Sequence, residues 1–141
     1  MINPQHILVV EDSDGDFETV QDAARRAKVV YPLVRAVSGE QCLGLLRNTA
    51  SNPGSVPLLL LLDLNTPGDD GRDVLREVRT DDGLRNLPVI ILSASANPRD
   101  LSFCYANGAN AYHVKHVDHG MHRQMLEQIF TYWTGSVVLP N

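Results

Sequence analysis

The chain has 141 residues, 43% of them hydrophobic and 21% charged, which is typical of a single globular domain. Its formal net charge of −5 gives no basic surface for nucleic acid, and no apolar run is long enough to span a membrane. The start lacks the features of a signal peptide, and Cys42 and Cys104 lack metal or redox spacing, so we expect a cytoplasmic protein with reduced cysteines.

Five apolar runs alternate along the chain with five helical patterns. The expected strands are His6–Val10, Leu33–Val37, Leu58–Leu62, Val89–Ser93 and Ala111–Val114. The third consists of five consecutive leucines, which is typical of a central strand buried on both faces. Strict alternation of strands and helices predicts a doubly wound α/β fold with a mostly parallel sheet and right-handed crossovers.

The helices are predicted from apolar spacing and from capping residues. The apolar positions that recur at helical spacing are Phe17, Val20, Ala24 and Ala27 in the first helix, Leu43 and Leu46 in the second, and Val74, Leu75 and Val78 in the third. Ser38 with Gln41 forms a capping-box pattern that opens the second helix. Asn97 and Pro98 suit the start of the fourth helix and Gly108 its end, and the last helix is expected from Asp118 to Trp133.

Acidic residues follow two of the predicted strands. Glu11 and Asp12 come directly after the first strand, and Asp63 comes directly after the third. Since the carboxyl ends of parallel strands share one edge of a sheet, where such folds place their ligands, these three carboxylates should lie together. Like charges at that distance repel strongly, so the arrangement predicts a bound cation.

A hydroxyl and an ammonium group fall at the ends of two further strands, at Ser93 and Lys115. Beside three carboxylates they suit a phosphoryl group, because the lysine offsets negative charge on its oxygens and the hydroxyl donates a hydrogen bond. The predicted chemistry is attack by the Asp63 carboxylate on phosphorus, which gives an acyl phosphate. Mg²⁺ is the expected cofactor, since it prefers a few carboxylates together with phosphate.

These residues, in this order and at these strand ends, resemble the receiver domain of two-component response regulators. The resemblance extends from His6 to Trp133, and the segment Asp63–Gly71 is similar to the loop that follows the family's phosphoacceptor. It implies a flavodoxin-like sheet of strand order 2-1-3-4-5, the order for which general accounts of doubly wound sheets cite a receiver of this type. It also implies a signalling protein rather than an enzyme with its own substrate.

The resemblance assigns a role to each site residue. Asp63 is the phosphoacceptor, and Lys115 contacts the phosphoryl group. Asp12 and Asp63 bind Mg²⁺ directly, Glu11 acts through a water, and the Asn65 backbone carbonyl supplies another ligand. Ser93 and Tyr112 correspond to the family's switch hydroxyl and switch aromatic residue.

Looser features resemble the single-domain regulators paired with cyanobacterial and bacterial phytochromes. They are the loop Thr49–Pro57, the sequence Asp63-Leu64-Asn65 and the ending Trp133–Pro140. The implied partner is a phytochrome-type histidine kinase, and the expected division is a receiver domain at 1–134 and an extension at 135–141. His116 departs from the family, which usually has a proline there, and a non-proline residue favours a trans peptide bond.

Three alternatives remain open at this stage. Asp63-Leu64-Asn65-Thr66 is close to the Asp-x-Asp-x-Thr signature of haloacid-dehalogenase-like phosphatases, although Asn65 replaces the second aspartate that those enzymes need. A degenerate receiver that binds partners without phosphorylation is another possibility. The third is a zinc site formed by histidines that recur at every third position, His113, His116, His119 and His122.

The last predicted helix has an apolar surface wider than its own core requires. Apolar residues cover about half of its circumference: Met121, Met125, Leu126, Ile129, Phe130, Tyr132 and Trp133. A surface helix needs roughly 100° of apolar face for its own domain, and the tail Val137–Pro140 adds further apolar residues. We therefore expect a homodimer held by the last helix and the C-terminal extension, as the resemblance also implies.

Overall fold

A five-stranded parallel sheet of order β2-β1-β3-β4-β5 forms the centre of the molecule. The structure is a computed structural model that describes residues 5–49, 55–65 and 71–140. The strands are β1 (Ile7–Val10), β2 (Leu33–Ala36), β3 (Leu59–Asp63), β4 (Val89–Ser93) and β5 (Ala111–Val114). The predicted doubly wound fold and its strand order are therefore confirmed.

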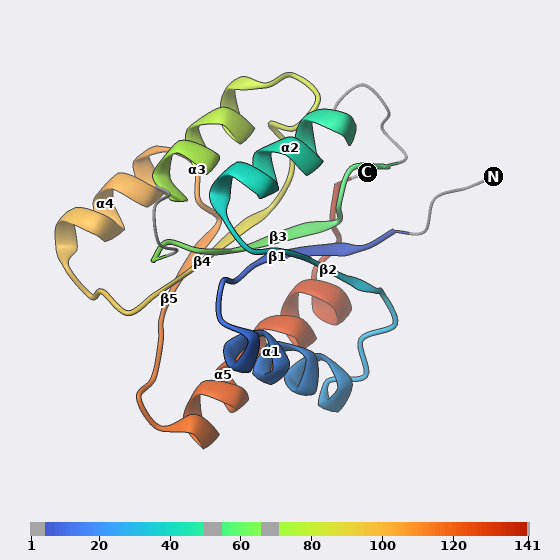
Figure 1. Ribbon diagram of the computed structural model, residues 1–141, viewed down its shortest axis with the longest axis vertical. Coiled ribbons are helices and arrows are strands. Elements are labelled where there is room, and N and C mark those ends of the chain that lie inside the picture. The colour runs from blue at the N-terminus through green and yellow to red at the C-terminus, as the bar shows by residue number, and fades with distance from the viewer. Residues whose placement is uncertain (1–4, 50–54, 66–70, 141) are drawn as a thin grey trace.

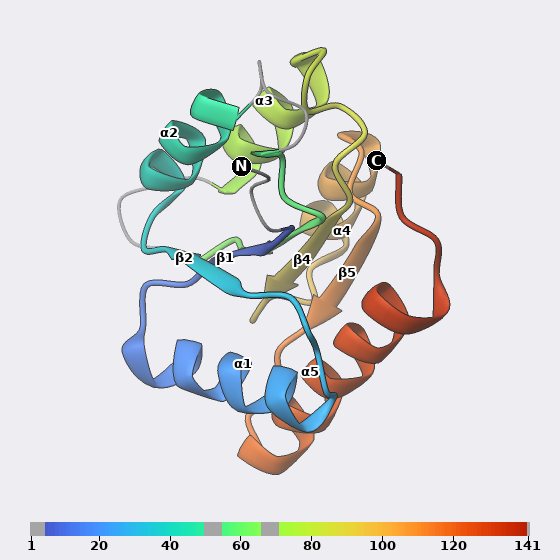
Figure 2. The ribbon, with the colours of Figure 1, turned by 90° about the vertical axis from the view of Figure 1, so that its right-hand side faces the viewer.

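Helices cover both faces of this sheet. They are α1 (Asp14–Arg26), α2 (Gly39–Thr49), α3 (Gly71–Thr80), α4 (Pro98–Ala106) and α5 (His119–Thr131). α2, α3 and α4 lie on one face, and α1 and α5 lie side by side on the other (Figure 1, Figure 2). Among the described residues, no helix is long and apolar enough to cross a membrane.

The predicted elements match the structure closely, with small shifts at strand ends. β2 stops before Val37, whose N–H donates to Gln41 Oε1 (2.7 Å). The predicted cap of α2 is present, since the Gln41 N–H donates to the Ser38 hydroxyl (3.0 Å). β3 includes Asp63, since the Leu64 N–H still donates to the Leu92 carbonyl (3.1 Å) and so extends the ladder. The Asn97 cap of α4 is present as predicted, and Gly108 follows that helix with a φ of 93°, which favours glycine.

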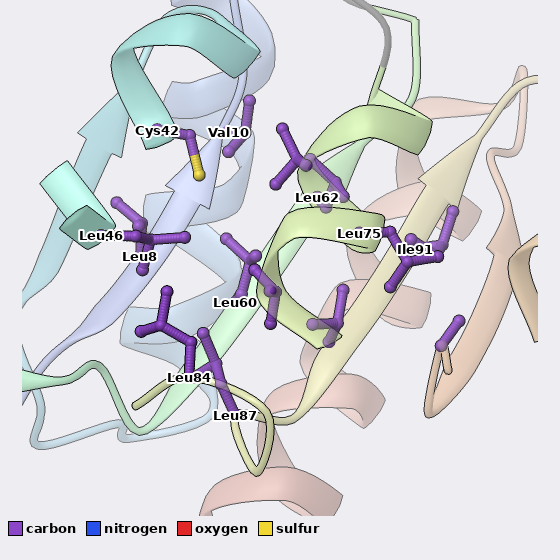
Figure 3. Close-up of a cluster of buried hydrophobic side chains, with 14 of the residues drawn as sticks. Leu8, Val10, Cys42, Leu46, Leu60, Leu62, Leu75, Leu84, Leu87 and Ile91 are labelled. Carbon is purple, nitrogen blue, oxygen red and sulfur yellow. The ribbon is translucent and has the colours of Figure 1, made fainter. Parts of the chain in front are cut away.

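The sheet is buried on both faces by two apolar clusters. One cluster lies between the sheet and α2, α3 and α4, where leucines of β1 and β3 meet Leu46, Leu75 and Cys42 (Figure 3). The other lies between the sheet and α1 and α5 and includes Phe130, which is fully buried. All five residues of β3 are buried, as expected for a central strand, so the carboxyl edge of the sheet has a rigid support.

The C-terminal end of the chain folds back on its own domain. α5 continues into a π-helical turn, Tyr132–Ser136, in which the Thr134 hydroxyl donates to the Phe130 carbonyl (2.6 Å). Trp133 and Leu139 are partly buried against the cluster on the α1 and α5 side. The domain boundary predicted after residue 134 falls inside this turn and stays a prediction.

Candidate functional site

The strand register brings the predicted acids together at the carboxyl edge of the sheet. Val10 of β1 pairs with Leu62 of β3, so Glu11 and Asp63 follow on neighbouring strands. One ligand oxygen from each of Glu11, Asp12 and Asp63 lies within 4.8 Å of the others. Glu11 and Asp63 are only 3% and 2% exposed, whereas Asp12 is exposed. Two buried carboxylates and one at the rim thus form the predicted acidic pocket.

Lys115 follows the carboxyl end of β5, and its side chain reaches the pocket across the end of β4. Its Nζ donates to Asp63 Oδ2 at 2.5 Å and lies 3.7 Å from Glu11 Oε1. Burial by itself lowers the pKa of Lys115, but the hydrogen bond to Asp63 and the charges of Asp63 and Glu11 outweigh burial and raise that pKa. The ammonium group therefore stays charged inside the pocket.

One positive charge does not balance three carboxylates. Burial raises the pKa of Glu11 to about 7; the charge of Lys115 opposes this shift and the charge of Asp63 adds to it. A further cation in the pocket would stabilise the ionised form of Glu11 and so offset this shift. Carboxylate oxygens are the ligands that Mg²⁺ and similar hard cations prefer, so the donor set fits a divalent metal ion.

Asn65 and Ser93 form the wall of the pocket beside Asp63. The Asn65 N–H donates to Asp63 Oδ1 at 2.9 Å, which orients the carboxylate. The Ser93 hydroxyl, 1% exposed as a residue, donates to Asn65 Oδ1 at 3.1 Å rather than to Asp63. Lys115 N–H in turn donates to the Ser93 carbonyl (2.8 Å), so the predicted serine and lysine are held next to each other.

Tyr112 is linked to this wall through the loop between β4 and α4. Its ring is half-buried against the core cluster under α4, and its hydroxyl donates to the Ser95 carbonyl at 2.8 Å. The Ser95 N–H donates to Ser93 Oγ (3.1 Å), and the Ser95 hydroxyl donates to Asp100 Oδ2 (2.6 Å). Ser95 thus connects the predicted switch residues with the first turn of α4.

Asp100 extends the same connection to α3. It forms an ion pair with Arg72, and the hydrogen bonds from Ser95 and Arg72 lower the pKa of Asp100. Ser95, Asp100 and Arg72 were not predicted as site residues. The polar segment after β4 contains the first two, but their pairing with an arginine of α3 is not visible in local spacing.

The histidine series does not form a second metal site. Within the described part of the chain, the acidic trio is the single group of three or more metal-capable side chains whose ligand atoms lie within 4.8 Å. His113 is in β5, His119 opens α5, and burial together with the Lys115 charge lowers the pKa of His122. The bond between Lys115 and His116 is trans, as predicted. Cys42 and Cys104 are helix residues, as predicted, and both are buried without a disulfide bond.

A 2-1-3-4-5 sheet with an acidic pocket and a lysine at its carboxyl edge defines a phosphoacceptor domain of two-component signalling. Comparison with known proteins agrees. The family described as "Response regulator receiver domain" matches residues 7–128. The chain therefore belongs to the response regulator receiver family, and the phosphatase alternative is not favoured.

One sequence comparison and two solved structures show the degree of similarity. Response regulator Rcp1 of Synechocystis is 33% identical over 138 residues, which cover 97% of this chain and 94% of that protein. The phosphorylated cyanobacterial phytochrome response regulator RcpA superposes with a TM-score of 0.89 at 33% identity and covers 99% of this chain and 100% of RcpA. The Mn²⁺-bound form of Rcp1 superposes with a TM-score of 0.89 at 32% identity, and the match covers 98% of this chain and 100% of that chain.

Proposed function

We propose that Asp63 is the phosphoacceptor of this receiver, with Lys115 and Ser93 as its partners in phosphoryl transfer. The observation that carries the proposal is the buried Asp63 carboxylate, oriented on one oxygen by the Asn65 N–H and on the other by Lys115 Nζ. These two bonds hold the carboxylate in a fixed orientation, which favours its attack on a phosphoryl group that enters the pocket.

In the reaction, an Asp63 oxygen forms a bond to phosphorus as the bond between phosphorus and a histidine nitrogen of the kinase breaks. The leaving imidazole keeps the electron pair of that bond and takes up a proton. Lys115, 2.5 Å from Asp63, offsets the charge that builds on the phosphoryl oxygens. The protein is therefore expected to catalyse only its own phosphorylation and dephosphorylation.

Glu11, Asp12, Asp63 and the Asn65 backbone carbonyl would hold a divalent cation beside the acceptor. We propose Mg²⁺ because it favours carboxylates together with phosphate oxygens. When bound, it supplies positive charge that Lys115 alone does not provide. The support is the convergence of three carboxylates in one pocket, and the Mn²⁺-bound form of the relative Rcp1.

Incubation with acetyl phosphate and Mg²⁺ tests this assignment against its rivals. We expect about one labile phosphoryl group per chain, observed by intact-mass spectrometry. Steady release of phosphate over many turnovers would instead indicate a phosphatase. No incorporation at all would indicate a degenerate receiver.

We propose that Ser93 and Tyr112 transmit phosphorylation to α4. Ser93 Oγ now donates to Asn65 and accepts from the Ser95 N–H. A phosphoryl group on Asp63 would draw this hydroxyl away from Asn65 and alter its bond to Ser95. Because Ser95 also binds Asp100 and the Tyr112 hydroxyl, the change would reach the first turn of α4 and shift an existing equilibrium between two forms.

The Ser93→Ala variant tests this coupling. Phosphorylation should remain measurable, because Asp63 and Lys115 are untouched. The response of α4 should weaken, because the hydroxyl that senses the phosphoryl group is gone. Amide hydrogen exchange over 97–108, measured with and without acetyl phosphate, reports that response. Ser102→Ala, which removes an exposed hydroxyl of α4, is the matched control. A full wild-type response in Ser93→Ala would contradict the role of Ser93.

The proposed donor is a phytochrome-type histidine kinase in the cytoplasm. The support is that the relative RcpA is a cyanobacterial phytochrome response regulator and matches this chain over almost its whole length. A phosphotransfer profile against the histidine kinases of the source organism identifies the donor. Preference for a kinase without a phytochrome sensor would overturn this proposal.

We also propose that the protein is a homodimer held by α5 and the C-terminal extension. Three apolar side chains there are half-exposed or more: Met121 (52%), Tyr132 (53%) and Val138 (94%). Trp133 and Leu139, by contrast, are partly buried against their own domain and are not available to a partner in this form. The exposed set leaves an apolar surface that a second copy would cover.

Light scattering on the full chain and on a variant truncated after Gly135 tests the dimer. We expect the full chain to be dimeric and the truncated variant to dissociate at lower concentration. Val138→Ser should weaken association, and Val30→Ser, which changes a similarly exposed valine outside the C-terminal region, is the matched control. A full chain that stays monomeric at tens of micromolar, with and without phosphate, would refute the proposal.

A further inference from the structure

Arg35 binds the loop between β1 and α1, which contains Glu11 and Asp12. From β2, its Nε donates to the Glu11 backbone carbonyl at 2.9 Å, and its Nη1 donates to Asp14 Oδ1 at 2.7 Å. The guanidinium also stacks over the Phe17 ring, 5.1 Å from its centroid. Its side chain is only 21% exposed, and its bond to the Glu11 carbonyl is partly buried, whereas the Asp14 carboxylate is 95% exposed. One side chain thus ties together the end of β1 and the first turn of α1.

Apart from Arg35, this loop is held by hydrogen bonds of Glu11 and of Ser13, the N-cap of α1, whose hydroxyl accepts from the Asp16 N–H (3.2 Å). The Glu11 N–H donates to the Ala36 carbonyl (2.9 Å), and the Ser13 N–H donates to Glu11 Oε2 (3.2 Å). The exposed Asp12 carboxylate has no hydrogen bond or ion pair to another described residue. Its place in the pocket is therefore set by the backbone on either side of it, where Arg35 holds both the Glu11 carbonyl and Asp14.

We propose that Arg35 is a positioning residue of the divalent-cation site. By fixing the backbone between Glu11 and Asp14, it keeps the Glu11 and Asp12 carboxylates where they converge with Asp63. The inference rests on the proposed function, because it assumes that these acids bind a cation. A lysine would not replace it, since a single ammonium group lacks the fork that spans a carbonyl and a carboxylate at once.

The direction of the change in Mg²⁺ affinity distinguishes a positioning role of Arg35 from the effect of its charge. Arg35 is itself a cation near the pocket, so its charge alone opposes the binding of Mg²⁺. If charge dominates, Arg35→Met raises the affinity for Mg²⁺. If positioning dominates, the same substitution lowers it. Arg35→Lys keeps the charge and loses the fork, so positioning predicts a loss there too.

Calorimetric titration with Mg²⁺ alone is the experiment, with wild type, Arg35→Met, Arg35→Lys and a control. We expect both substitutions to raise the dissociation constant about tenfold, as is typical when a group that orients metal ligands is lost. Arg26→Met, which removes a cation paired with Asp22 elsewhere on α1, should leave the dissociation constant unchanged. At saturating Mg²⁺, phosphorylation of Arg35→Met by acetyl phosphate should return to the wild-type rate, which a general loss of structure would not allow. Affinity equal to or tighter than wild type in Arg35→Met overturns the proposal.

A second pair of variants decides the question even if Arg35→Met does not fold. Asp14→Ala removes the 95%-exposed carboxylate that anchors Nη1, and Asp16→Ala removes the carboxylate that interacts electrostatically with Glu11 and Lys115. We expect the larger loss of Mg²⁺ affinity in Asp14→Ala, although Asp16 is the acid whose charge acts on the pocket. An equal or smaller loss overturns the inference. Failure of the wild-type protein to bind Mg²⁺ or accept phosphate would instead refute the proposed function itself.

Discussion

Asp63→Asn is expected to abolish phosphorylation completely while leaving the fold intact. The amide oxygen can still accept from the Asn65 N–H, and the side chain keeps its size in a site that is 2% exposed. The amide cannot attack phosphorus at a useful rate, because its oxygen lacks the negative charge that makes a carboxylate oxygen nucleophilic. Intact-mass spectrometry after incubation with acetyl phosphate and Mg²⁺ measures the result directly.

The fold of this variant should hold because the pocket carries excess negative charge. Removing one carboxylate relieves repulsion with Glu11, and Lys115 keeps its contact with Glu11 at 3.7 Å. Asp73→Asn, a change of an exposed aspartate in α3, is the control and should accept phosphate as wild type does. Wild-type incorporation of labile phosphate in Asp63→Asn would assign the acceptor to another residue.

The gathering of the site residues at the carboxyl edge of the sheet was predictable, because it depends only on strand order and on which residues follow each strand. The family resemblance implied the order 2-1-3-4-5, in which β1 and β4 flank β3, so Glu11 was expected on one side of Asp63 and Ser93 on the other. The structure has this register, with Val10 opposite Leu62 and Asp63 opposite Leu92. No side-chain geometry was needed to bring these groups together.

Interactions between elements distant in sequence could not be predicted in the same way. Arg35 lies 24 residues from the Glu11 carbonyl that it binds, and Arg72 lies 28 residues from Asp100. An arginine in an edge strand or at the start of a helix looks like an ordinary surface residue in the sequence. The partner of each guanidinium depends on side-chain rotamers and on the orientation of helices. Neither can be deduced from the periodicity of the sequence.

The C-terminal region shows a similar limit. The width of the apolar arc on α5 predicted a partner surface beyond its own core. Part of that arc is covered within the domain, since Trp133 packs against the core and the chain turns back through Tyr132–Ser136. A helical wheel counts apolar positions, but it does not show whether the partner surface belongs to the same chain.

Withdrawal of Mg²⁺ is expected to stop phosphorylation of the wild-type protein, and Asp12→Ala is expected to weaken Mg²⁺ binding strongly. Three carboxylates and an incoming phosphoryl group share a pocket with one ammonium group, so repulsion blocks the approach unless a further cation is bound. Losing one carboxylate about 4 Å from a divalent ion removes about 2 kcal/mol of attraction even in bulk water, which is more than tenfold in affinity.

Asp12 suits this experiment because its side chain is exposed, so its removal leaves no cavity and no unpaired partner in the core. Calorimetry with Mg²⁺ measures the affinity, and acetyl phosphate with and without a chelator measures the dependence of phosphorylation on the metal. Asp82→Ala makes the same change of charge at a 97%-exposed position outside the acidic pocket and should bind Mg²⁺ as wild type does. If Asp12→Ala retained wild-type affinity, Asp12 would not be a ligand, and the site would have to be built from the two buried acids alone.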